Sequence, residues 1–140
     1  MKLKFKNQDF QTAAVKAVCD LFSGQEKQYK HFSLSGDSNQ ASLFQKELGL
    51  GNALLIDDDT MLKNLQSVQK RHHLPLSQSL EDRQFCVEME TGTGKTYVYT
   101  KTILELHKLY GFTKFIIVVP SVAIREGVLK SLQITDEHFG

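Results

Sequence analysis

The residues best suited to chemistry lie in one short stretch, Glu88 to Tyr99, with the sequence EMETGTGKTYVY. Its Gly94-Lys95-Thr96 ending matches the end of the phosphate-binding pattern GxxxxGK[ST]. In such a loop, backbone N–H groups cradle phosphate oxygens, the lysine reaches the outer phosphates and the hydroxyl residue holds magnesium. The stretch therefore predicts a site for a nucleoside triphosphate and Mg²⁺.

Each part of that chemistry has a residue at the required position. The Gly92 to Gly94 turn carries no side chain that would obstruct a phosphate at either end, Lys95 supplies the cation, and Thr96 supplies the hydroxyl. A helix that begins here would point the positive end of its dipole at the phosphates. One residue departs from the pattern, because Met89 stands in place of the first glycine. The alternative is a glycine-rich turn between a strand and a helix that binds nothing.

The elements on either side of the loop agree with the motif, which requires a strand before it and a helix after it. Residues 85–89 favour a short strand, and residues 95–110 have helical spacing. The β-branched run Phe115-Ile116-Ile117-Val118-Val119 is typical of a strand buried in a parallel sheet. Together they predict a right-handed βαβ unit, followed by a helix from Val122 to Leu132 with Ser121 as its cap.

The chain before the loop predicts two more helices joined by a polar connection. Phe10, Ala14 and Leu21 fall on one face of a helix that ends near Gly24, and a second helix runs from Asp59 to His73. Three aspartates, Asp57 to Asp59, fit the negative charge favoured at a helix start. They also have the form of a magnesium-holding strand end, but such a strand follows the phosphate loop in this kind of fold, so a metal role is the lesser alternative.

Composition limits the classes of protein to which this chain could belong. The 140 residues are 41% hydrophobic and 24% charged, as expected of one globular domain or part of a larger protein. With a net charge of +1 and scattered basic residues, composition alone shows no footprint for nucleic acid. Cys19 and Cys86 have no metal-ligand spacing and are expected to be reduced, buried thiols. The longest apolar run is too short to cross a bilayer, so we expect a cytoplasmic protein without membrane contact.

Two longer stretches carry a family resemblance. METGTGKT resembles motif I of superfamily 2 helicases, whose loop often lacks the first glycine. VEMETGTGKTYVY, followed by GFTKFIIVVPSVAIREGV, resembles the ATP-dependent restriction (Res) subunit of type III restriction-modification enzymes. The resemblance is strongest from Phe85 to Leu132 and weaker over the two preceding helices. Met89 is an ordinary part of the loop in that family.

The resemblance implies roles for individual residues. Lys95 resembles the lysine that contacts the β- and γ-phosphates, and Thr96 the magnesium ligand. Gln11 is the candidate for reading the adenine edge, with Gln8 as its rival. Arg125 is a candidate for the DNA backbone, although it could instead pair with Glu126 or Asp136. The implied nucleotide-binding set is Phe10, Gln11, Thr91, Gly92, Thr93, Gly94, Lys95 and Thr96, and the implied DNA-binding set is Pro120, Ser121 and Arg125.

The same resemblance implies a partial RecA-like α/β domain, with helices flanking a mostly parallel sheet. Residues 1–140 would be the N-terminal part of the first helicase lobe, made of an adenine-contacting helix (1–24), a loop-and-helix insertion (25–84) and the P-loop βαβ unit through motif Ia (85–140). The magnesium-holding acid pair of motif II and the nuclease residues would lie outside this stretch.

The whole protein would couple ATP hydrolysis to movement along double-stranded DNA before an endonuclease domain cuts it. A modification methyltransferase subunit would be its partner, while this fragment would bind ATP and Mg²⁺ without turnover. Two alternatives stay open: a small P-loop kinase or nucleotide hydrolase, and a non-enzymatic interaction module that uses residues 25–84 as its surface.

Overall fold

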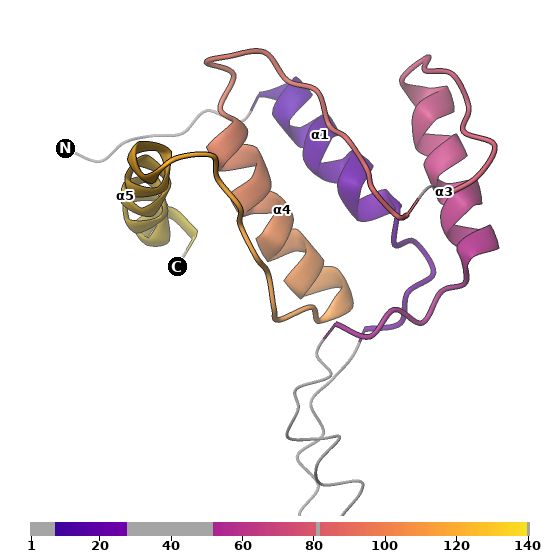
Figure 1. The fold of residues 1–140 in the computed structure, drawn as a ribbon. Helices are drawn as coiled ribbons and strands as arrows, with labels where there is room; N and C mark the ends of the chain where they lie inside the picture. Colours follow the sequence, from indigo (N-terminus) through magenta and orange to yellow (C-terminus); the bar gives the residue numbers. More distant parts are fainter. Residues whose placement is uncertain (1–7, 28–51, 81, 140) are drawn as a thin grey trace, which may run out of the picture.

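Four helices form the part of the protein described by the computed structural model, which covers residues 8–27, 52–80 and 82–139, with side chains to residue 133. They are α1 (Asp9–Asp20), α3 (Asp58–Arg71), α4 (Lys95–Tyr110) and α5 (Val122–Phe139). α1 packs between α4 and α3, and α5 contacts α4 (Figure 1). The amino ends of α1 and α4 lie at the same end of this helical layer.

The prediction of a mostly parallel sheet is wrong, since residues 8–27, 52–80 and 82–139 contain helices and no strand. A β-branched run can favour an extended backbone, but a strand forms only where a neighbouring segment pairs with its N–H and C=O groups. Residues 85–89 and 115–119 lack such pairing within the described part of the chain. The α/β class and the βαβ unit are therefore replaced by helices joined by irregular segments.

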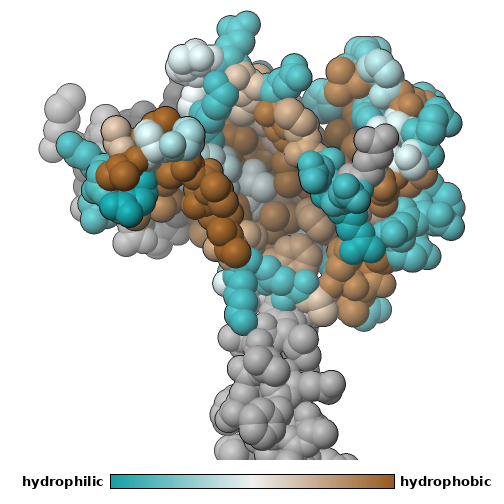
Figure 2. All heavy atoms as spheres, viewed as in Figure 1, coloured by the Kyte–Doolittle hydropathy of each residue, from teal (hydrophilic) through white to brown (hydrophobic). Residues whose placement is uncertain are grey.

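The second of these segments leaves large apolar side chains in solvent. Ile116 is 92% exposed and Val118 is 87% exposed, whereas Phe115 and Ile117 on the alternate positions are 36% and 41% exposed. Figure 2 shows hydrophobic side chains gathered along this segment, between α4 and α5. The prediction that this run would be buried on both faces is also wrong.

The helix boundaries follow the local signals in the sequence. α4 spans the predicted residues and ends at Gly111, whose φ of 74° suits a glycine at that position. The Asp57 carboxylate accepts a hydrogen bond of 2.8 Å from the Thr60 N–H, which confirms that the aspartates serve the start of α3. The Ser121 hydroxyl likewise accepts from the Ile124 N–H, and α5 continues past the predicted end.

The main core lies between α1 and α4. Phe22 packs edge-to-face against Phe112, with ring centroids 5.4 Å apart. The inward face of α1 differs from the prediction, because Phe10 is 50% exposed. The buried members of the core are Val15, Cys19, Val98, Leu106 and Phe112.

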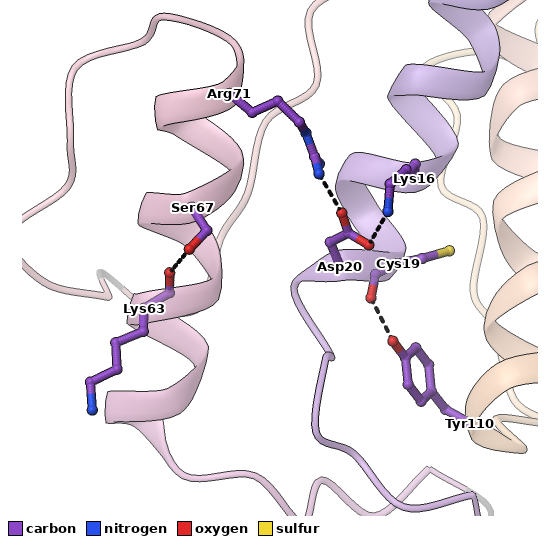
Figure 3. Close-up of polar contacts among 7 residues, drawn as sticks. All are labelled: Lys16, Cys19, Asp20, Lys63, Ser67, Arg71 and Tyr110. Atoms are coloured by element: carbon purple, nitrogen blue, oxygen red, sulfur yellow. Dashed lines mark hydrogen bonds and ion pairs between the residues drawn. The ribbon is translucent and has the colours of Figure 1, made fainter.

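The two cysteines have different environments. Cys19 is buried in this core, and burial, with the nearby negative charges of Glu105 and Asp20, raises its pKa to about 11. Its backbone carbonyl accepts a hydrogen bond of 2.9 Å from the Tyr110 hydroxyl (Figure 3). Cys86 is exposed, which contradicts the prediction of a second buried thiol, because the segment that carries it does not enter a sheet.

One carboxylate joins α1 to α3. Asp20 accepts hydrogen bonds from Arg71 of α3 at 2.7 Å and from Lys16 at 3.0 Å (Figure 3). Partial burial acts to raise the pKa of Asp20, but the two hydrogen bonds outweigh it and leave the pKa below its ordinary value. Asp20 is therefore stabilised in its charged form by the fold.

This arrangement predicts an acid-dependent loss of stability. Because the folded-state pKa of Asp20 lies below the ordinary 3.8, its contribution is present above that pH and is lost as the pH falls through the folded-state pKa. We expect Asp20→Asn to lower the free energy of unfolding by no more than about 1 kcal/mol near neutral pH, and to have no effect in strong acid. Urea unfolding across this pH range measures the difference, with Asp82→Asn, at an exposed residue outside the helices, as the control. An Asp20→Asn effect that persists in strong acid would contradict it.

Candidate functional site

The glycine-rich loop turns directly into α4. Gly92 and Gly94 have φ angles of 81° and 85°, in the left-handed region that favours glycine. Gly94 is the N-cap residue of α4, no side chain caps this helix end, and no acidic residue lies in its first turn. The positive end of the α4 dipole is thus without a compensating side chain of its own, as an anion site requires.

Lys95 folds back over this loop. Its ammonium donates a hydrogen bond of 2.7 Å to the backbone carbonyl of Glu90, and the Thr93 hydroxyl donates one of 2.6 Å to the same oxygen. The side chains of Thr93 and Lys95, late in the loop, are thereby both hydrogen-bonded to Glu90 at its beginning. The result places the lysine charge beside the turn at Gly92 to Gly94, and the Lys95 side chain remains exposed.

Helix α1 brings a second side chain to the loop. The Gln11 amide donates a hydrogen bond of 2.9 Å to the Thr93 carbonyl, although the two residues are far apart in the sequence. Gln8, the rival candidate, is the exposed N-cap residue of α1 and makes no side-chain capping bond. Phe10, next to Gln11, presents a half-exposed ring. The structure thus joins Gln11 to the loop through Thr93, while its role at an adenine edge stays a prediction.

The predicted DNA-backbone residues lie at the start of α5. Ser121 caps the helix through its hydroxyl. The Arg125 guanidinium contacts the Glu126 carboxylate at 3.0 Å, with both side chains 61% exposed, so the ion-pair alternative is the one formed here. Contact of Pro120, Ser121 or Arg125 with DNA stays a prediction.

The aspartates before α3, which had a metal role as the lesser alternative, do not gather with other metal ligands in the described part of the chain. Asp58 forms an ion pair with Arg83, with 2.6 Å between Nη2 and Oδ1. His72 and His73 lie at the end of α3, where His72 is the C-cap residue. Across the described ranges, no three histidine, cysteine, aspartate or glutamate side chains are grouped to hold a metal ion. No helix within these ranges has the length and hydrophobicity needed to cross a membrane.

Two features of the loop were not predicted from the sequence. One is the use of the Glu90 carbonyl as the common acceptor for Lys95 and Thr93. The other is the Gln11 contact with the Thr93 carbonyl. Both acceptors are backbone groups, which every residue carries, so residue types gave no signal for either contact.

Gly94 is the loop glycine at which an added side chain is expected to cost the most stability. A Cβ atom there would lie 2.7 Å from the Gln11 amide nitrogen, whereas a Cβ at Gly92 would meet nothing within 4 Å. We expect Gly92→Ala to cost about 1–2 kcal/mol of unfolding free energy through its positive φ alone. Gly94→Ala should cost more, because the displaced Gln11 adds to the same strain.

Urea unfolding of the two glycine variants measures this difference. Adding Gln11→Ala to Gly94→Ala should recover part of the loss, whereas adding it to Gly92→Ala should not. Equal losses for both glycine variants, or no recovery, would show that Gln11 is not pressed against this position.

Comparisons with known proteins agree on one group. A family model described as "Type III restriction enzyme, res subunit" matches residues 4–138. The chain is 34% identical over 139 residues to the Res subunit of the type III restriction-modification enzyme EcoPI of Escherichia phage P1, covering 96% of this chain and 13% of that protein. It is 41% identical over 80 residues to the EcoP15I Res subunit of Escherichia coli, covering 56% of this chain and 8% of that protein.

A shorter match is closer in sequence. The chain is 66% identical over 41 residues to the StyLTI Res subunit of Salmonella typhimurium, covering 29% of this chain and 4% of that protein. The chain spans no more than 13% of any of these three relatives. No solved structure was found with significant similarity to the chain.

Proposed function

The chain belongs to the Res-subunit family of type III restriction enzymes, as the resemblance indicated, and from this premise we propose that it binds ATP with Mg²⁺. The proposed site is the turn from Thr91 to Gly94, together with Lys95 and Thr96. Its task would be to hold the triphosphate at the start of α4. The observation that carries the proposal is the convergence of an uncapped helix end, the Lys95 ammonium and the Gln11 amide on a single loop.

The geometry supports an anion at this position. A phosphate approaches closely only where the backbone is bare, and at Gly92 nothing lies within 4 Å of the position a Cβ would take. Lys95 is exposed and is held by a single neutral acceptor, the Glu90 carbonyl, rather than by a carboxylate. A phosphate oxygen is a stronger acceptor for an ammonium than a neutral carbonyl is, because it adds the attraction between two opposite charges.

The first turn of α4 also carries a hydroxyl suited to magnesium, on the partly buried Thr96. Mg²⁺ is usually held by few protein ligands, together with phosphate oxygens and water, so it does not need a cluster of carboxylates. Thr96, the first residue after Lys95, would supply the hydroxyl ligand. When bound, the ion would neutralise charge on the outer phosphates.

For the longer protein, we propose the wider role implied by the family. Its helicase part would couple ATP hydrolysis to movement along double-stranded DNA, and a separate endonuclease part would cut the DNA. A modification methyltransferase subunit would be its partner, and Pro120, Ser121 and Arg125 would contact the DNA backbone. On its own, the present chain would bind nucleotide without turnover.

A titration with a fluorescent ATP analogue and Mg²⁺ tests the nucleotide site. ATP and ADP should displace the analogue, and GTP should do so less well if Gln11 reads the adenine edge. Inorganic triphosphate should also compete, because the loop recognises phosphates. Absence of binding by a chain that retains its helical circular dichroism would contradict the proposal and would favour a structural role for the loop.

Gln11→Ala separates two roles for this residue. Loss of affinity for ATP alone would indicate adenine reading. Equal loss for ATP, GTP and inorganic triphosphate would indicate that Gln11 acts through the Thr93 carbonyl, by holding the loop in shape.

A further inference from the structure

A buried amide side chain lies far from the phosphate loop. Gln25 is 6% exposed, and a buried amide is costly unless its donors and acceptor are hydrogen-bonded. Its Nε2 donates to the Ala53 carbonyl at 3.2 Å and to the Glu26 carbonyl at 3.3 Å, while its Oε1 accepts from the Leu55 N–H at 2.8 Å. The Gln25 side chain thus supplies the backbone groups of residues 53 and 55 with hydrogen bonds that a paired strand would otherwise supply.

A second amide continues this pattern. The Asn52 Oδ1 accepts from the backbone N–H groups of Thr113 and Lys114 at 2.8 Å and 3.1 Å, and its Nδ2 donates to the Lys114 carbonyl. Residues 113 and 114 follow directly after α4 and its glycine cap. Gln25 therefore joins the segment before α3 to the residues that follow α1. Asn52 joins the same segment to the residues that follow α4.

These contacts lie on either side of the connection 28–51 in the sequence. Gln25 lies just before that connection and Asn52 directly after it. Among the described residues, the partners of the two amides are all backbone groups, so these bonds do not require any particular side chain within the connection. We propose that Gln25 and Asn52 form an amide clasp that fixes the segments on either side of this connection, residues 25–26 and 52–55, to the helical layer, independently of the sequence of the connection.

The clasp and the phosphate loop lie at opposite ends of α4. The phosphate loop lies at its amino end and the clasp at its carboxyl end, so changes within residues 28–51 should leave the loop intact. The clasp is tested through backbone amide exchange and needs no nucleotide, so it stands or falls separately from the proposed ATP site.

The first experiment replaces residues 28–51 by a flexible Gly/Ser linker of about 12 residues, long enough to span roughly 40 Å when extended. Amide hydrogen exchange measured by NMR should show protection of the Leu55 N–H within about threefold of the original chain. The Leu106 N–H inside α4 serves as the reference. Loss of Leu55 protection with Leu106 still protected, or loss of both through unfolding, would overturn the proposal.

The second experiment removes the clasp while the connection is kept. Gln25→Met preserves side-chain length but not the hydrogen bonds, so exchange of the Leu55 N–H should rise at least tenfold. Gln78→Met, at an exposed glutamine, is the matched control and should change nothing. If Gln25→Met does not fold, Asn52→Ala provides the same test on the Thr113 and Lys114 N–H groups. Unchanged exchange of the amides tested would refute the clasp.

Discussion

Replacing Lys95 by alanine is expected to weaken binding of an ATP analogue roughly 10- to 100-fold, since a hydrogen bond to a charged group is worth about 1.5–3 kcal/mol. The lysine is the charged side chain that folds over the turn at Gly92 to Gly94. Removing it leaves the helix end and the backbone amides in place. Residual weak binding, rather than complete loss, is therefore the expected result.

The matched control is Lys108→Ala. Lys108 lies in the last turn of the same helix and is exposed, so its loss should leave the affinity within about twofold. Fluorescence titration at fixed Mg²⁺ and moderate salt gives both dissociation constants, and circular dichroism confirms that each variant is folded. Equal affinities for Lys95→Ala and the original chain would exclude Lys95 from the site.

Leu106→Ala is expected to produce the largest loss of stability, about 2–5 kcal/mol. Leu106 is 7% exposed and belongs to the core that joins α4 to Val15 and Cys19 of α1. Truncating it removes buried methyl groups and leaves a cavity that the two helices can close only in part. For a chain of this size the melting temperature should fall on the order of 10–20 °C.

Leu109→Ala is the control for that change. It has the same chemistry on the same helix, but Leu109 is 45% exposed, so its truncation should cost less than about 1 kcal/mol. Urea unfolding followed by circular dichroism measures both. Equal costs for the two leucines would mean that the α1–α4 packing is not the stabilising core.

The same packing positions the site. Gln11 reaches the loop only because α1 lies against α4. We therefore expect Leu106→Ala to weaken nucleotide binding through loss of the folded population, while the intact fraction keeps its affinity. An affinity corrected for the folded fraction distinguishes this from a direct effect.

The helices could be predicted from the sequence because their signals are local. The glycine after Tyr110, the aspartates before α3 and the serine before α5 each act within one helical turn, and each boundary was found where these residues place it. The phosphate loop was predicted for the same reason, because its residue types are contiguous.

The sheet could not be predicted in this way, because pairing is not a property of one segment. Residues 115–119 have strong β-propensity, yet in the described part of the chain they find no strand to pair with. The Gln11, Gln25 and Asn52 contacts were equally invisible, since each joins an amide to backbone groups distant in sequence. Amide side chains carry no periodicity that would reveal such partners.

The contrast between the two cysteines has a practical consequence. Cys19 is buried with a raised pKa, so at neutral pH it is almost entirely the unreactive thiol, whereas Cys86 is exposed. A maleimide dye should therefore attach to Cys86 alone in the unaltered chain. Cys86 lies on the irregular segment that leads into the glycine turn, four residues before Glu90. The protein thus carries a built-in attachment point for a fluorophore that reports on movement of this segment when a ligand is added.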